Sequence, residues 1–131
     1  MRKLLATLIL FNCLSGMVYA GIPAEQAVNA VIGEALHDEV SMDAMCHALR
    51  NRGSLRGVYG YKSGRRDSPK LHALGVKTWF ASLKTPDVTK GATHWLSDYD
   101  LSHCKPRLTS FRFKMVETAY IGQTHFYKGG A

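Results

Sequence analysis

A glutamate at the edge of a helical apolar face is the residue whose position best suits chemistry. Between Pro23 and Leu36, apolar residues recur at the three- and four-residue spacing of one helix face. Glu34 lies about 90° from the centre of this face, in line with Ala27 and Ala30. These small neighbours predict a groove over the carboxyl group, where partial desolvation favours the protonated form. Such an acid can deliver a proton, although a helix-surface carboxylate without a special role has the same pattern.

Histidine and cysteine, the other side chains suited to chemistry, do not define a site by their spacing. The six histidines are scattered and none forms a pair with zinc-ligand spacing, so a zinc amidase is disfavoured and no metal or cofactor is expected. Cys46 and Cys104 remain if an N-terminal segment that contains Cys13 is removed. They leave a disulfide open, but the position of Cys46 on an apolar helix face favours a buried free thiol.

Three helices are predicted to position these residues. The first spans residues 23–36 and has Pro23 at its first position. Ser41 caps the second helix, and Gly53 ends it. The pair Ser68-Pro69 opens the third helix, which Pro86 stops.

A loop and several strands are predicted for the rest of the chain. Residues 50–70 are rich in glycine and basic residues, which is typical of a long surface loop. A turn at 87–91 precedes a short strand at 92–95. Alternation of Phe111, Phe113 and Met115 with basic residues predicts another strand, and the run after Gly122 returns antiparallel to it. The expected fold class is α+β, with helices and a short β-hairpin.

Length and composition fit one small exported domain. With 131 residues, 46% of them hydrophobic and 21% charged, the chain is too short for two domains and too apolar for disorder. Arg2 and Lys3 precede an uncharged stretch, and small residues near Ala20 suit a cleavage site. Residues 1–20 are therefore expected to be a signal peptide and 21–131 the exported domain, with a retained membrane anchor as the alternative. Without Arg2 and Lys3, 15 basic and 10 acidic residues remain, a net charge of +5.

Five short blocks carry a resemblance to a known family. In chain order they are Ile32–Ala35, Leu49–Gly53, Gly57–Gly60, Asp87–Trp95 and Phe126–Lys128. In order and spacing they resemble the SleB-like cell wall hydrolase family, which includes spore cortex-lytic enzymes and related phage and bacterial muralytic proteins. The resemblance implies a lysozyme-like, transglycosylase-like domain that cuts the glycan strands of peptidoglycan at N-acetylmuramic acid.

The resemblance also implies roles for individual residues. The catalytic glutamate of the family falls on Glu34, and the family is generally understood as lytic transglycosylases in which one glutamate serves as acid and then as base. Tyr59, Thr93, His94 and Trp95 are implied to bind the substrate. Core packing of Trp95 and a structural role for His94 are the alternatives.

A hydrolase with two carboxylates would need a second acid on the other side of the sugar. None stands out, because four candidates suit capping or solvated positions equally well: Asp38, Glu39, Asp43 and Asp87. Asp38 would add a like charge one turn after Glu34 if the helix continued that far. The single-glutamate mechanism is therefore the simpler interpretation, with muramidase-type hydrolysis as the alternative.

The chain departs from the family pattern in three places. Leu96-Ser97 follow Trp95 where phage relatives tend to carry an acid and an amide. Thr124 stands where a histidine is common, with His125 one place later, and the connection after Glu34 is one residue short. These departures leave the assignment of Glu34 intact and affect only the accessory residues.

The partners expected for this chain depend on its expected export and its basic charge. An exported basic chain meets glycan strands and anionic cell-wall surfaces in the periplasm, the cell wall or the extracellular space, so nucleic acid is not an expected partner. A membrane is a partner only if the signal segment is retained. A non-enzymatic cationic protein that binds the wall is the alternative to an enzyme.

Overall fold

The computed structural model describes residues 21–60 and 68–130, and this part of the chain has an α+β fold. The elements are α2 (Ala24–Glu34), α3 (Glu39–Arg52), α4 (Pro69–Ala81), β1 (His94–Ser97), α5 (Asp98–His103), α6 (Pro106–Thr109), the 3₁₀ helix η3 (Ser110–Lys114), β2 (Met115–Ile121) and β3 (Thr124–Gly129). The expected signal peptide and residues 61–67 of the expected basic loop lie outside the described residues. Within the described ranges, no helix is both long and apolar enough to cross a membrane.

The apolar face of α2 forms the centre of the core. It buries Ala27, Val28, Ala30, Val31 and Ile32. Gly75 on α4 allows close packing here, since an added Cβ would lie 3.1 Å from the side chain of Val28 and 3.2 Å from that of Ile32. The helix is shorter than predicted: it starts after Pro23 and ends at Glu34, because Ala35 is extended.

The ends of α3 and α4 agree only in part with the predictions. Asp38, not Ser41, caps α3, and its Oδ1 accepts a hydrogen bond from the backbone N–H of Ser41 at 2.8 Å. Aspartate is as good an N-cap as serine, so the helix starts at the earlier residue. Gly53 ends α3 in the left-handed conformation with φ 71°, as predicted. Ser68 caps α4 as predicted, but the helix ends at Ala81, well before Pro86.

The three strands form an antiparallel sheet in the order β1-β3-β2. The predicted hairpin is confirmed as β2 and β3, which turn at Gly122. The strand predicted for 92–95 lies two residues later, at 94–97. The alternating residues Phe111 and Phe113 belong to η3, not to a strand. Phe111 lies outside the sheet. Its ring packs on the rings of His94 and Tyr127, and the ring centroids are 5.4 and 6.1 Å away.

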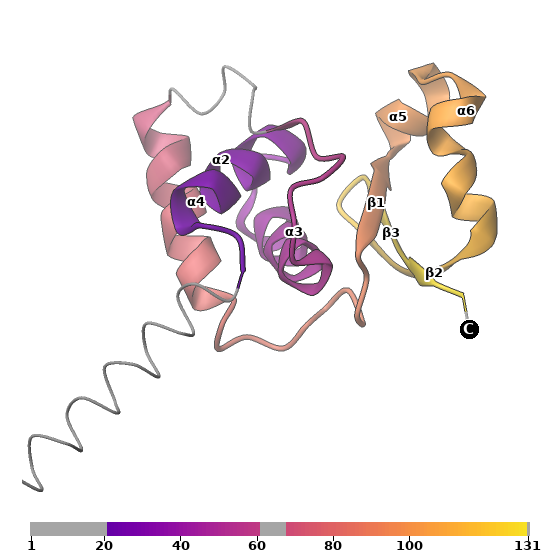
Figure 1. Cartoon of the computed structure of the whole chain (residues 1–131). Helices are drawn as coiled ribbons and strands as arrows, with labels where there is room; N and C mark the ends of the chain where they lie inside the picture. The colour runs from indigo at the N-terminus through magenta and orange to yellow at the C-terminus, as the bar shows by residue number, and fades with distance from the viewer. Residues whose placement is uncertain (1–20, 61–67, 131) are drawn as a thin grey trace, which may run out of the picture.

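The sheet stands between two groups of helices (Figure 1). Helices α2, α3 and α4 lie on one side, where Phe126 of β3 is buried with them in the core. Helices α5, α6 and η3 lie on the other side. Strand β1 forms one edge of the sheet, and it contacts α3 of the first group and α5 of the second.

Candidate active site

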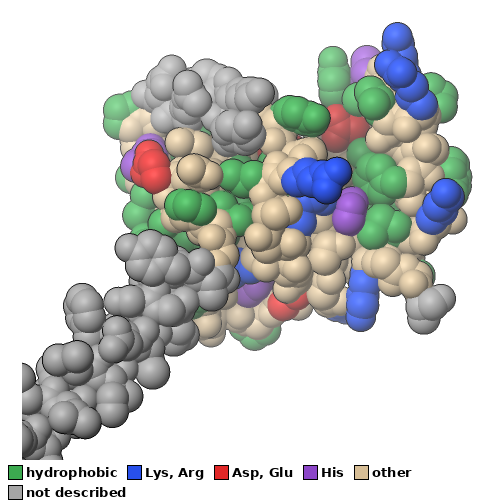
Figure 2. All heavy atoms as spheres, in the orientation of Figure 1, with side chains coloured by type: hydrophobic (Ala, Val, Ile, Leu, Met, Phe, Trp, Pro, Cys, Tyr) green, Lys and Arg blue, Asp and Glu red, His purple; other side chains and the backbone are tan. Residues whose placement is uncertain are grey.

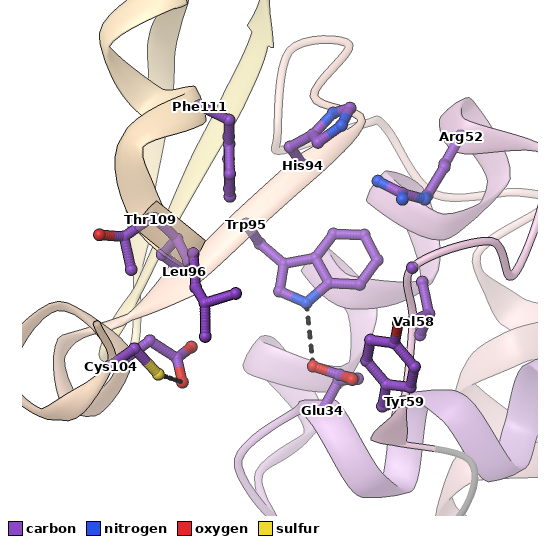
Figure 3. Close-up of a pocket in the computed structure, with 13 residues that line it drawn as sticks. Glu34, Arg52, Val58, Tyr59, His94, Trp95, Leu96, Cys104, Thr109 and Phe111 are labelled. Atoms are coloured by element: carbon purple, nitrogen blue, oxygen red, sulfur yellow. Dashed lines mark hydrogen bonds between the residues drawn. The ribbon is translucent and has the colours of Figure 1, made fainter. Parts of the chain in front are cut away.

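A cleft of about 560 Å³ is lined by residues of both groups of helices and of β1. From the first group of helices, α2, α3 and the loop after α3 contribute Glu34, Arg52, Gly57, Val58 and Tyr59 to the lining. The other wall and β1 contribute His94, Trp95, Leu96, Asp100, Cys104, Leu108, Thr109 and Phe111. Figure 3 shows Cys104, Leu96 and Thr109 on the opposite side of Trp95 from Tyr59 and Arg52.

Glu34 is held in this cleft by donors from two other segments. Its Oε1 accepts a hydrogen bond from the backbone N–H of Gly60 at 2.7 Å. Its Oε2 accepts one from Trp95 Nε1 at 3.2 Å (Figure 3). Since Glu34 is the last residue of α2, the helix end, the 57–60 loop and β1 together fix the carboxylate.

Two glycines make this arrangement possible. A Cβ on Gly33 would lie 1.8 Å from the carbonyl oxygen of Gly60, far inside van der Waals contact. A Cβ on Gly60 would lie 2.5 Å from Cγ of Glu34. The blocks that contain Gly33-Glu34 and Gly57–Gly60 are thus in direct contact, and glycine is required at both contact points.

Arg52 brings a positive charge to the carboxylate. Its Nη1 donates to the carbonyl oxygen of Thr93 at 3.1 Å, its Nη2 donates to that of Arg56, and its guanidinium lies 5.8 Å from the Trp95 ring centroid. Burial lowers the pKa of Arg52, and the charge of Glu34 opposes that shift. This cation stands at the end of α3, on a different helix from Glu34.

Asp38 would have stood one turn after Glu34 if the first helix had continued that far, and it does not. Because α2 ends at Glu34, Asp38 does not stand one turn further along the same helix. It caps α3 instead. The charged side chain whose pKa responds to Glu34 is Arg52, which has the opposite charge.

The other predicted site residues lie at or beside the cleft. Tyr59 and His94 line it, and Tyr59 is 70% exposed. Thr93 does not line the cleft, but its Oγ1 shares a hydrogen bond of 2.8 Å with Nδ1 of His94, which does. Burial, and then the charge of Arg52, lower the pKa of His94 below its ordinary 6.5. His94 is therefore mostly neutral near pH 7.

Sequence reasoning missed one carboxylate of the cleft, Asp100. Its Oδ2 accepts from the Ser97 backbone N–H at 2.9 Å, while Ser97 Oγ accepts from the Asp100 N–H at 3.0 Å. This capping box has the pattern of Ser followed three residues later by an acid, which is visible in the sequence. Arg52 and Phe111 were also missed, and no local pattern marks them as lining residues.

The four acids considered in the sequence do not line the cleft. Asp38 caps α3, and Glu39 pairs with Lys77 at 3.2 Å. Asp43 accepts a hydrogen bond from Thr85 at 3.0 Å. Asp87 organises the 87–91 turn, where hydrogen bonds from that turn and from α3 outweigh burial and lower its pKa.

The described residues contain no group of three or more potential metal ligands. Cys46 and Cys104 are free thiols, so the disulfide left open by the sequence is not formed. Cys46 is buried, as its helix face predicted, and Cys104 lies in the cleft. Comparison of the chain with protein-family models, curated proteins and solved structures finds no match.

Proposed function

We propose that this chain is a peptidoglycan-cleaving lytic transglycosylase in which Glu34 is the only catalytic acid and base. The observation that carries the proposal is the carboxylate of Glu34, held by Gly60 and Trp95 in the wall of an open cleft. The resemblance of the sequence blocks to the SleB-like family supports the same assignment, and a lysozyme-like fold is part of the proposal.

The two hydrogen bonds to Glu34 suit a change of protonation. The bond from Gly60 to Oε1 is short, whereas the bond from Trp95 to Oε2 is longer. A protonated Glu34 keeps the bond from Gly60 at Oε1 and exchanges the weaker one for donation from Oε2 to the glycosidic oxygen. Once the proton has been delivered, the bond from Trp95 to Oε2 can form again, which holds the carboxylate in place for its second role as base.

The reaction then needs no second carboxylate. Glu34 protonates the leaving glycosidic oxygen as the C1–O bond breaks, and the 6-hydroxyl of N-acetylmuramic acid forms a new bond to C1. The carboxylate takes the proton of that hydroxyl, which closes the 1,6-anhydro ring and restores the acid. The exposed ring of Tyr59 is placed to stack on a sugar, and neutral His94 offers a hydrogen bond.

Muramidase-type hydrolysis is the second candidate, and the presence of Asp100 in the cleft favours it. A second carboxylate is what an attacking water would need. However, Asp100 already accepts hydrogen bonds from Ser97 and, over 3.8 Å, from the Cys104 thiol. Because Oδ2 is engaged in helix capping and Oδ1 faces the Cys104 thiol, we place it second.

The proposed setting is outside the cytoplasmic membrane, after cleavage of residues 1–20, with glycan strands and the anionic wall as partners. A non-enzymatic cationic protein would share the net charge of +5 of residues 21–131 and the attraction to the wall. On the face shown in Figure 2, Lys and Arg side chains stand at several separate places. Such a protein would not depend on the Glu34 carboxyl group.

Loss of turbidity of purified sacculi separates these classes. Glu34→Gln keeps the size and hydrogen-bonding reach of the side chain but cannot deliver a proton, so binding to sacculi should persist while cleavage stops. Glu39→Gln, on the exposed surface of α3, is the matched control and should retain activity. Asp100→Asn should retain substantial activity in the transglycosylase. Clearing by Glu34→Gln at the wild-type rate would contradict the proposal.

A further inference from the structure

A histidine outside the cleft is bound between two carboxylates. His125 Nδ1 lies 2.7 Å from Glu117 Oε1, and Nε2 lies 2.8 Å from Asp98 Oδ1. Tyr120 Oη donates to Asp98 Oδ2 at 2.7 Å, and the Tyr120 ring stacks on His125 at 4.3 Å between centroids. The cluster joins α5 through Asp98, β2 through Glu117 and Tyr120, and β3 through His125.

The geometry requires a proton on both ring nitrogens. An ionised carboxylate only accepts hydrogen bonds, so each nitrogen that faces one must be a donor. Partial burial is the largest influence and lowers the pKa of His125, but the bonds and charges of Glu117 and Asp98 outweigh it and raise the pKa above 6.5. Arg112 of η3 is the cation that lines the same small cavity as His125 and Glu117.

The cluster is connected to the wall of the cleft through α5. Asp98 is the first residue of this six-residue helix, and its backbone N–H donates to the Gln123 carbonyl oxygen at 2.9 Å. Asp100 within α5 and Cys104 directly after it line the cleft. The hairpin therefore holds the helix whose far end forms part of the wall.

We propose that His125 is a positioning residue: its imidazolium holds α5 against the β2–β3 hairpin and thereby sets the wall of the cleft that carries Asp100 and Cys104. When the ring loses one proton, a nitrogen lone pair faces a carboxylate, and that contact becomes repulsive. The hold on α5 then weakens. Any effect on glycan cleavage rests on the proposed function, but the position of α5 does not.

The thiol of Cys104 reports the position of this wall without any substrate. The full chain is treated with 2,2′-dithiodipyridine, which reacts with thiols over a wide pH range, and modification at Cys104 is followed by peptide mass spectrometry. Cys46 is the internal control, since burial raises its pKa to about 12 and it should stay unmodified while the chain is folded. The matched control variant is His72→Gln, which removes a half-buried histidine beside Glu25. His72 belongs to α4, which lies across the sheet from α5 (Figure 1).

At about pH 5.5, Cys104 should react several-fold faster in His125→Gln than in wild type, whereas at about pH 8.5 the two rates should converge. His125→Ala, which cannot donate to either carboxylate, should give the same result, and circular dichroism checks that both variants are folded. Equal rates at low pH, or a ratio that does not change with pH, would overturn the proposal.

The outcome is independent of the reaction. Glu34→Gln should show the wild-type pattern of Cys104 protection, because the cluster does not involve the carboxyl group in the cleft. If sacculi are cleaved but Cys104 does not respond to His125, the positioning role fails alone. If Cys104 responds but no glycan is cleaved, the proposed function fails alone.

Discussion

At the scale of single residues, the hydrogen-bond donors to Glu34 determine the orientation of its carboxylate more than its position on α2 does. A helix end alone leaves a glutamate free to rotate, but Gly60 and Trp95 fix both oxygens of this one. The sequence placed Trp95 in the correct region and left cleft and core as alternatives. The structure combines the two alternatives: Trp95 packs against the core, and its indole N–H reaches Glu34 in the cleft.

The two tryptophans offer a matched test of this role. Trp95→Phe keeps an aromatic ring but removes the donor that orients the carboxylate, so glycan cleavage should fall by about tenfold or more, the equivalent of one hydrogen bond to a charged group. Trp79→Phe instead affects a buried ring that stacks against Arg50 at 3.7 Å, so it should lower the free energy of unfolding and leave the rate per folded molecule unchanged. Turbidity assays and urea unfolding measure the two effects. Unchanged cleavage by Trp95→Phe would remove the indole from the mechanism.

At the scale of elements, the site depends on how closely the end of α2 approaches the 57–60 loop. Gly33→Ala should destabilise the fold by about 1–3 kcal/mol or more, because its Cβ would meet backbone atoms of Gly60, which cannot rotate away as a side chain can. Gly129→Ala is the control, since a Cβ there has no neighbour within 4 Å. Urea unfolding of both variants checks this, and equal stability of the two would contradict the close approach.

The predicted helix ends were correct where interactions within one turn of the chain decide the structure. Gly53 and Ser68-Pro69 end and start helices because their conformations and capping groups act within one turn. The alternation of Phe111, Phe113 and Met115 predicted a strand, which was wrong for residues 111–114 and right for Met115. The pattern does not reveal the rings of His94 and Tyr127, which contact Phe111. Likewise, neither Arg52 nor Asp100 could be assigned to the cleft before the contacts of β1 with both groups of helices were known.

At the scale of the whole molecule, proton binding by His125 should contribute to global stability. Its pKa in the folded chain is raised above 6.5, so its stabilising contribution is complete below about pH 6.5 and is lost as the pH rises through the folded value. Hydrogen bonds from Tyr120 and then His125 lower the pKa of Asp98, which keeps this partner ionised in that range.

The free energy of unfolding should therefore differ more between wild type and His125→Gln at about pH 5.5 than at about pH 8.5. Urea unfolding at both pH values measures the two differences. His72→Gln serves again as the control and should show a smaller change with pH. A constant difference between wild type and His125→Gln would mean that the ring is not preferentially protonated in the folded chain.

The central claim, that Glu34 alone cleaves the glycan strand, is tested most directly by mass spectrometry of the fragments released from purified sacculi. Wild type should release muropeptides with 1,6-anhydro-muramyl ends. Glu34→Gln, shown to be folded by circular dichroism, should release them at least about 100-fold more slowly, because the acid and base steps are both lost. A folded Glu34→Gln variant that releases anhydro-muropeptides at close to the wild-type rate would contradict the account, as would release by wild type of free stem peptides without any cut in the glycan.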